Sequence, residues 1–279
     1  MSMPNNLLFV RHGQSEANIL QTAAKKGDES LYTDSTYTVP DRSWRLSPVG
    51  VRQASTIGRY IQSLFPQGFD RYFVSPYTRT RETAAMLGLE QDFPRQHWEE
   101  NRIVRERFWG EIGSMPLSTF LKEYPRSAML KKIDPLYWAP PGGESIAEVC
   151  DSRVHGLLDT LHREDAEHDV IVVTHGEFMW ASMLNIERWS DEEFVHRDKD
   201  RAYKLHNCMT VHYTRIDPVT GEQAGKLRWV RRFYPSWTGT GGSEEWTVVS
   251  TDWEQFDKPV LSNGDLLEKV KTQPSRIGC

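Results

Sequence analysis

The most constraining feature of the sequence is a run of four apolar residues, Leu7 to Val10, followed at once by Arg11, His12 and Gly13. Such a run predicts a short strand buried on both faces. The residues after it predict a helix, so polar groups lie where a buried strand ends. In an open α/β fold this point lies at the carboxyl edge of the sheet, where such folds place their sites. Taken alone, an arginine and a histidine that merely end a strand would explain the segment equally well.

Strand-like and helix-like segments alternate from residue 6 to about residue 185. After the first strand we expect, in chain order, a helix over 15–26, a helix over 47–64, a strand over 72–74, a helix over 75–87, a short strand at 103–104, helical pieces over 116–138, an amphipathic helix from 145 and a strand over 170–174. This alternation predicts helices on both faces of a parallel-rich sheet. The expected fold class is therefore α/β, a three-layer α/β/α sandwich with a mostly parallel central sheet.

Residues 27–45 interrupt this alternation, because they show neither a helical nor a strand period. We expect an ordered loop rather than disorder, since Tyr32, Tyr37 and Trp44 can pack against the rest of the molecule. Long loops without secondary structure are often functional.

The last part of the chain has a different composition. Alternating apolar residues around 209–213 and 227–233 predict late strands. From Pro235 onward the chain is rich in Gly, Ser and Thr. We expect one main domain over residues 1–234 and a partly irregular C-terminal extension over residues 235–279.

Composition excludes several classes of partner. The formal net charge of −5 argues against nucleic acid as the main partner. No apolar run approaches the roughly 20 residues of a membrane span, so no membrane partner is expected. Cys150, Cys208 and Cys279 are too few and too scattered for a disulfide framework or a zinc site. The default expectation is a cytoplasmic protein.

Three predicted strand ends carry related chemistry. They bring Arg11, His12, Arg79 and His175 to one edge of one sheet. Backbone N–H groups at helix N-termini favour an anion, and guanidinium forks suit phosphate oxygens. One histidine can attack phosphorus while the other stabilises charge on the transferring group. A carboxylic acid is still needed to protonate the leaving oxygen.

Five segments in this order resemble the histidine phosphatase superfamily, in the branch of cofactor-dependent phosphoglycerate mutases and related phosphatases. The resemblance covers residues 6 to about 185. Its segments are Arg11-His12-Gly13 with Ser15 and Asn18, Ser75-Pro76 with Arg79, Glu106 near a glycine, Gly143-Glu144-Ser145, and Thr174-His175-Gly176. It implies a phosphoglycerate mutase-like fold for the 1–234 domain, which would then be the catalytic domain.

The resemblance also implies roles for single residues. His12 would become phosphorylated, and Glu106 would be the proton donor. The phosphate pocket would be completed by Arg11, Arg79 and His175, with Ser15, Asn18 and Gly176 as further phosphate-binding positions.

Alternatives remain for some of these positions. The acid could instead be Glu99, Glu100 or Glu111, although the first two read as a solvated loop. Arg81 lies two residues past Arg79 and should point elsewhere as a surface charge. Asn18 could simply face solvent on its helix.

The function expected from the sequence is a phosphomonoester phosphatase acting through a phosphohistidine on a small phosphorylated metabolite. No metal or organic cofactor is expected, because arginines and histidines can compensate the charge of the transferring group. The alternatives are phosphoryl transfer of the phosphoglycerate mutase type and a binding module without turnover. Aromatic residues such as Tyr32 and Trp109 could line the entrance or fill a core. The oligomeric state stays open.

Overall fold

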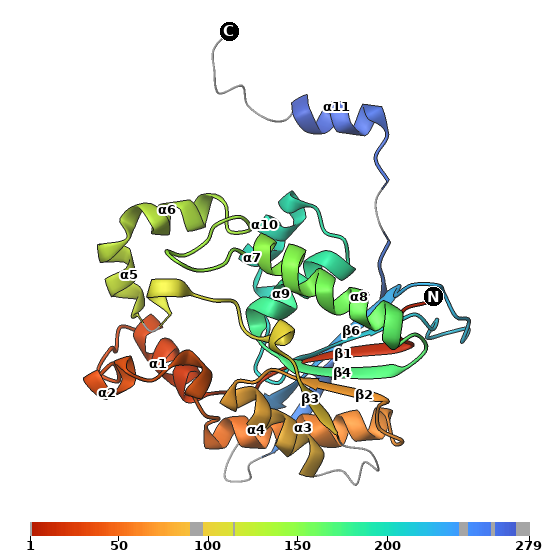
Figure 1. Cartoon of the computed structure of the whole chain (residues 1–279), viewed down its shortest axis with the longest axis horizontal. Helices are drawn as coiled ribbons and strands as arrows, with labels where there is room; N and C mark the ends of the chain where they lie inside the picture. Colours follow the sequence, from red (N-terminus) through yellow and green to blue (C-terminus); the bar gives the residue numbers. More distant parts are fainter. Residues whose placement is uncertain (1, 90–96, 114, 240–244, 258–259, 272–279) are drawn as a thin grey trace.

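A mixed sheet runs through the centre of the molecule (Figure 1). The structure is a computed structural model that describes residues 2–89, 97–113, 115–239, 245–257 and 260–271. Within these residues the strands are β1 (Asn6–Arg11), β2 (Arg71–Val74), β3 (Trp98–Glu100), β4 (Asp169–Thr174), β5 (Thr210–Thr214), β6 (Trp229–Trp237), β7 (Trp246–Ser250) and β8 (Glu254–Gln255).

The sheet is parallel on one side of β1 and antiparallel on the other. Its order is β3-β2-β4-β1-β5-β6-β7, and β8 pairs with β6. β1, β2, β3 and β4 run parallel to one another, whereas β5 pairs antiparallel with β1 and the strands beyond it also pair antiparallel. The carboxyl ends of β1, β2 and β4 therefore meet at one edge.

The α-helices of the described residues lie on both faces of this sheet and beyond it (Figure 1). They are α1 (Glu16–Lys25), α2 (Asp34–Tyr37), α3 (Pro48–Leu64), α4 (Thr78–Leu89), α5 (Leu117–Glu123), α6 (Pro125–Ile133), α7 (Ile146–Glu148), α8 (His155–Glu164), α9 (Gly176–Ile186), α10 (Asp191–Lys199) and α11 (Asn263–Lys271). Short 3-10 helices are η1 (Asp41–Ser43), η2 (Arg102–Val104), η3 (Gly110–Ile112) and η5 (Arg201–Tyr203), and a π-helical turn, η4 (Val149–Val154), joins α7 to α8. α3 and α4 lie on one face, and α8 and α9 lie on the other (Figure 1).

The side chains of β1 alternate between two apolar cores. Leu7 and Phe9 belong to the core under α8 and α9, while Leu8 and Val10 belong to the core under α3 and α4. All four are at most 1% exposed, which confirms the expected strand buried on both faces. The expected layered α/β architecture is also confirmed.

A third, smaller apolar cluster lies outside the two main cores. Phe120, Ala128 and Trp138 form it, with Trp109 packed against them. It holds α5 and α6 together. We call the described residues 109–113 and 115–138, which include both helices, the cap.

Two short elements differ from expectation near β2. The strand expected at 103–104 is wrong, because these residues lie in η2. The strand of this region is β3, which contains Glu99 and Glu100 and pairs only with β2 among the described strands. Its side chains are mostly exposed, so no apolar run or alternation marks it in the sequence.

The limits of α4 also differ from expectation. The helix begins at Thr78 rather than Ser75, and it continues past Gly88 to Leu89. Ser75 instead directly follows β2, and its N–H donates to Val173 O at 3.0 Å.

The 27–45 segment is more regular than the sequence suggests. It contains α2 and η1, of four and three residues, which are too short to show a helical period. Thr33 caps α2 in a reciprocal capping box with Thr36. Trp44 is buried as expected, whereas Tyr37 is largely exposed.

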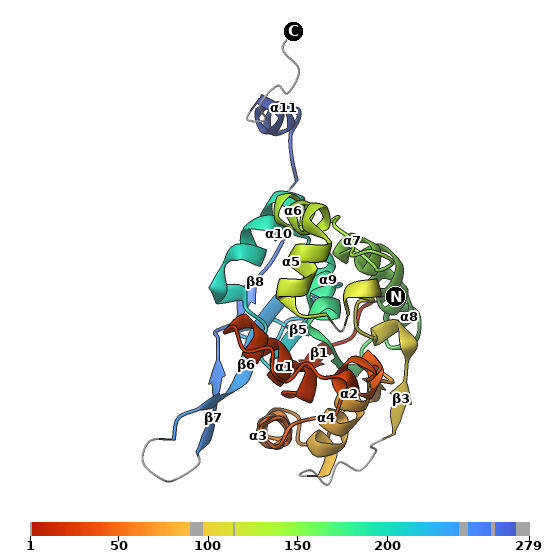
Figure 2. The same cartoon turned by 90° about the vertical axis from the view of Figure 1, so that its left-hand side faces the viewer.

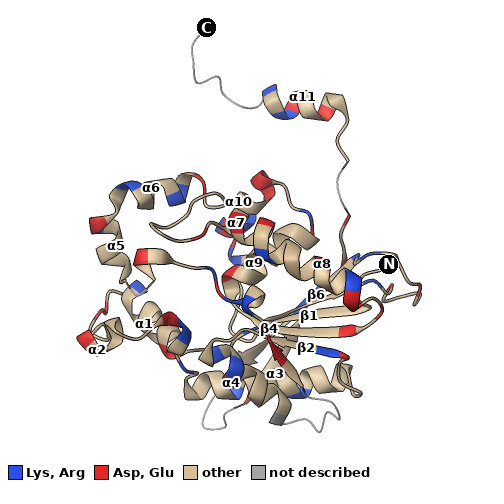
Figure 3. Ribbon diagram, viewed as in Figure 1, with Lys and Arg blue, Asp and Glu red and all other residues tan. Residues whose placement is uncertain are grey.

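Beyond β6 the chain adds β7 and β8 to the sheet, so the residue 234 boundary falls inside a strand. The chain then forms α11, which the sequence analysis did not predict and which lies apart from the sheet (Figures 1 and 2). Lys269 of α11 pairs with Glu192 of α10 at 3.2 Å. Among the described residues, no helix combines the length and hydrophobicity needed to cross a bilayer. Basic and acidic residues are interspersed over the elements (Figure 3).

Candidate active site

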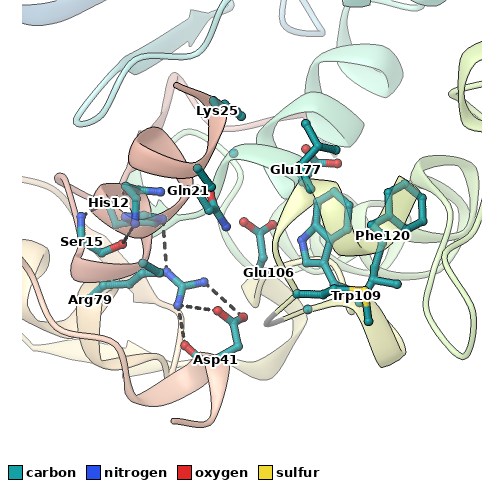
Figure 4. A pocket seen from close by; sticks show the side chains of 18 of the residues that line it. His12, Ser15, Gln21, Lys25, Asp41, Arg79, Glu106, Trp109, Phe120 and Glu177 are labelled. Carbon is teal, nitrogen blue, oxygen red and sulfur yellow. Dashed lines mark hydrogen bonds and ion pairs between the residues drawn. The ribbon is translucent and has the colours of Figure 1, made fainter. Parts of the chain in front are cut away.

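A cavity of about 410 Å³ opens at the carboxyl ends of β1, β2 and β4 (Figure 4). Seven of the eight residues that the sequence analysis selected line it: Arg11, His12, Ser15, Asn18, Arg79, Glu106 and Gly176. The eighth, His175, lies directly behind His12, and the two ring centroids are 5.2 Å apart. Elements far apart in the sequence thus bring the expected residues together.

His12 follows β1 in a turn that packs tightly on α3. A side chain at Gly13 would lie 2.5 Å from Gly50 O, so only glycine fits there. His12 Nδ1 is 2.7 Å from Gly13 O. A carbonyl oxygen can only accept, so we assign the ring proton to Nδ1. Nε2 is then the acceptor, and Arg79 Nε donates to it at 3.2 Å.

His12 is neutral in this environment. Burial lowers the pKa of its imidazole well below the usual value, and the guanidiniums of Arg79 and Arg11 lower it further. The ring therefore keeps a lone pair on Nε2, which a nucleophile needs.

His175 is fully buried at the end of β4. Its Nε2 lies 2.8 Å from Ser75 Oγ, which explains one use of the serine after β2. Its Nδ1 is a buried atom with no hydrogen-bond partner in the described structure, and it lies 4.0 Å from Glu106 Oε2. Burial lowers the pKa of this imidazole too, followed by the nearby Arg79 charge.

The next residue, Gly176, begins α9 and leaves room for Arg11. A side chain here would lie 3.3 Å from Arg11 Nε. Arg11 donates from Nη1 to Leu205 O at 2.5 Å, and its Nε is buried without a partner among the residues described. That guanidinium retains a donor at the edge of the cavity.

Glu106 lies in the middle of the cavity, between the His12–Arg79 side and the Trp109 side (Figure 4). Burial raises the pKa of its carboxyl to about 7, and the charge of Glu177 raises it as well. The hydrogen bond from Arg107 N, at 2.9 Å, opposes this shift. Glu106 can therefore hold or release a proton near neutral pH.

The three alternative acids lie elsewhere. Glu99 pairs with Arg71, Glu100 pairs with Arg81, and Glu111 accepts from the Tyr124 hydroxyl. None of the three lines the cavity. The geometry favours Glu106, and it places Arg81 on the surface as the sequence analysis expected.

A family model, that of the histidine phosphatase superfamily (branch 1), matches residues 7–208. The chain belongs to this family. Its matched range covers β1 to the residues before β5 and therefore all the site residues above.

Proteins similar to this chain include mutases, mutase-like proteins and phosphatases. The chain is 28% identical over 211 residues to phosphoglycerate mutase-like protein AT74 of Arabidopsis thaliana, a match that spans 69% of this chain and 60% of the plant protein. It is 26% identical over 196 residues to a 2,3-bisphosphoglycerate-dependent phosphoglycerate mutase of Cytophaga hutchinsonii, covering 69% and 82% of the two chains. The fold matches that of mycobacterial glucosyl-3-phosphoglycerate phosphatase, with TM-score 0.56, 18% identity and coverage of 75% and 89%.

In the described structure Glu144 holds the loop that carries Glu106. Its carboxylate accepts from Arg105 at 3.0 Å, from Arg153 at 2.8 Å and from Phe108 N at 2.8 Å. Arg153, which lies in the π-helical turn η4, also donates to Arg105 O at 2.6 Å. The Gly143-Glu144-Ser145 segment thus positions Glu106 as well as capping α7 with Ser145.

Ser15 and Asn18 first serve the start of α1. Ser15 Oγ accepts from Asn18 N at 3.3 Å, and Asn18 Oδ1 accepts from Ser15 N at 3.2 Å. Asn207 donates to the same Oδ1 at 3.0 Å. Asn18 Nδ2, which donates to no described residue, remains available to an anion. The solvent-facing alternative for Asn18 is wrong, because its side chain lines the cavity.

The sequence analysis did not select several residues of the cavity wall: Gln21, Lys25, Asp41, Lys131 and Glu177. Glu177 could have been found, because it directly follows the His175-Gly176 strand end. Lys131 of α6 lies over the rings of Trp109 and Trp138, at 5.3 and 4.9 Å from their centroids. Within the described residues, no three His, Cys, Asp or Glu side chains form a metal-binding group.

Proposed function

We propose that this protein is a phosphomonoester phosphatase that works through a phosphohistidine intermediate. The observation that carries the proposal is the pairing of a neutral His12 with Glu106, whose pKa of about 7 suits a proton donor. Arg11 and Arg79 beside them offer the positive charge that a transferring phosphoryl group requires.

In the first step His12 Nε2 attacks phosphorus, and the bond from phosphorus to the leaving oxygen breaks. Glu106 gives its proton to that oxygen, so the product alcohol leaves neutral. In the second step water attacks the phosphohistidine, the phosphorus–nitrogen bond breaks, and the Glu106 carboxylate accepts a proton from the water. The products are inorganic phosphate, neutral His12 and protonated Glu106, and no atom changes its oxidation state.

His175 is proposed to stabilise the transferring group. If the Ser75 hydroxyl donates to Nε2, the ring proton lies on Nδ1. That N–H has no other partner among the described residues, and it faces Glu106 at the centre of the site. It can donate to a phosphoryl oxygen in the transition state.

The proposed substrate is a small phosphorylated metabolite whose leaving group contacts the cap. The wall beyond Glu106 is formed by Trp109 and Phe120, with Lys131 over the Trp109 ring, and Lys25 at the end of α1 also lines the cavity (Figure 4). Neither lysine forms an ion pair with a described residue. A leaving group with an apolar portion and an anionic substituent fits this wall best.

The second candidate function is phosphoryl transfer of the phosphoglycerate mutase type, which the similarity to the Cytophaga mutase favours. We expect hydrolysis to dominate. Incubated with 3-phosphoglycerate and a bisphosphoglycerate primer, the protein should release inorganic phosphate and form little 2-phosphoglycerate. Both products can be measured in one time course by phosphorus NMR. Isomerisation that outpaces phosphate release would instead assign the mutase function.

The pKa of Glu106 predicts the pH dependence of the first step. Because this pKa is raised to about 7, the carboxyl is protonated below that pH and loses its proton above it. For an alkyl phosphate, kcat/KM should therefore fall about tenfold per unit of pH well above 7. With p-nitrophenyl phosphate, whose leaving group needs less protonation, the decline should be much shallower. Equal profiles for the two substrates would contradict the role of Glu106 as acid.

A further inference from the structure

Arg79 already holds a carboxylate. Its Nη1 donates to Asp41 Oδ1 at 3.1 Å and to Asp41 O at 2.6 Å, and its Nη2 donates to Asp41 Oδ2 at 3.4 Å (Figure 4). Its Nε donates to His12. All three nitrogens of this guanidinium are therefore engaged, and the fork that suits a phosphate faces two carboxylate oxygens instead.

The two partners differ in how easily they can separate. The Arg79 side chain is 5% exposed and fixed on α4, whereas the Asp41 side chain is 39% exposed. Asp41 can therefore return to water at little desolvation cost, while Arg79 cannot. Asp41 lies in η1, a three-residue helix whose first residue follows Pro40 and which has no side-chain cap.

The residues that follow Asp41 in the sequence keep it near Arg79 even when the Asp41–Arg79 ion pair is broken. Arg45, four residues later, donates to Glu82 of α4 at 2.7 Å, and Leu46 N donates to the same carboxylate at 2.6 Å. The backbone of this stretch is thus tied to the helix that carries Arg79. A group tethered in this way competes with a free ligand at an effective concentration in the millimolar range.

We propose that Asp41 sets the affinity of the site for phosphate, because its carboxylate and a phosphate group compete for Arg79. A phosphate dianion that uses the Arg79 fork meets like charge from Asp41, so the carboxylate must withdraw. Asp41 is a positioning residue that acts through Arg79. This inference rests on the proposed function only in placing phosphate at Arg79.

This competition weakens the binding of every phosphate that uses Arg79, including the inorganic phosphate left after hydrolysis. Release of that product is thereby favoured. The substrate phosphate displaces the Asp41 carboxylate from Arg79 on binding, and the carboxylate displaces the product phosphate from Arg79 on release. The buried guanidinium therefore keeps an anionic partner throughout. Removing the carboxylate should tighten phosphate binding.

The experiment measures the Kd of inorganic phosphate by calorimetry, in the full chain. Asp41→Asn and Asp41→Ala should each lower the Kd about tenfold relative to the unchanged protein. Asp41→Glu keeps the charge and should leave the Kd within about twofold. Asp34→Asn is the matched control, because Asp34 is an exposed carboxylate of the same 27–45 segment. It should leave the Kd unchanged.

Turnover adds a second readout. The Asn variant should lower KM for a phosphomonoester without raising kcat, whereas a loss of local structure would lower kcat and raise KM together. Thermal melting should first show that the Asn and Ala variants are folded. The proposal is overturned if the Kd of inorganic phosphate for these folded variants equals or exceeds that of the unchanged protein. Tighter phosphate binding in a protein that hydrolyses no phosphomonoester would support this inference and count against the proposed function.

Discussion

Replacing His12 with asparagine should abolish phosphomonoester turnover, with a loss on the order of 10⁴–10⁶-fold in kcat. The reason is that His12 Nε2 is proposed to form the bond to phosphorus, and an amide cannot replace it. Asparagine keeps a polar side chain beside Arg79, so the cavity should still bind phosphate. Turnover should be monitored as the release of inorganic phosphate. Phosphate binding should be measured separately, to show that the site is intact in the variant.

The same experiment can trap the intermediate. When the unchanged protein is quenched during turnover of a phosphorus-32 substrate, it should carry label that is lost in acid and kept in base, mapped to His12. The His12→Asn variant should carry none. His196→Asn, at an exposed position of α10, is the control and should label normally. Label that maps to His175 would show that the nucleophile has been misassigned.

Replacing Glu106 with glutamine should separate substrates by their leaving groups. An alkyl phosphate leaves as a strongly basic alkoxide and needs a proton, whereas p-nitrophenyl phosphate leaves as a stabilised phenolate. Glutamine has similar size but cannot donate the proton. Phosphorylation of His12 should therefore slow by about 10²–10⁴-fold with the alkyl ester and change little with the nitrophenyl ester.

Single-turnover rates should be used, so that later steps do not mask the effect. Glu111→Gln is the matched control, because Glu111 lies in the same region but outside the cavity. It should affect both substrates alike or neither. Equal losses for both esters in Glu106→Gln would mean that this carboxyl only supports the structure.

The strand ends could be predicted because they carry strong local patterns. Four consecutive apolar residues precede Arg11, and four more, at 170–173, precede Thr174 and His175; such runs are typical of deeply buried strands. Parallel pairing of β1 with β4 then places their carboxyl ends side by side. The capping signals at Ser47 and Ser145 were equally local, and both helices begin where these predict.

The parts that could not be predicted depend on tertiary contacts. β3 exists because β2 offers an open edge, and its own residues are mostly exposed. The contact of Asp41 with Arg79 joins residues 38 positions apart through a stretch without any period. Lys131 of α6 lines the cavity, and the position of α6 depends on the packing of Phe120, Ala128 and Trp138 against one another. No local sequence pattern predicts these tertiary contacts.

The separate apolar cluster of the cap has an evolutionary consequence. His12 and His175 are fixed by adjacent strands of the main sheet, whereas Trp109, Phe120 and Lys131 belong to a unit with its own small core. Substitutions among these three residues can reshape the far wall of the cavity without changing a member of either large core. A lineage could in this way acquire new leaving groups while it inherits the phosphoryl chemistry unchanged. Selection for a new substrate would then change residues of the cap and leave the residues at the strand ends unchanged.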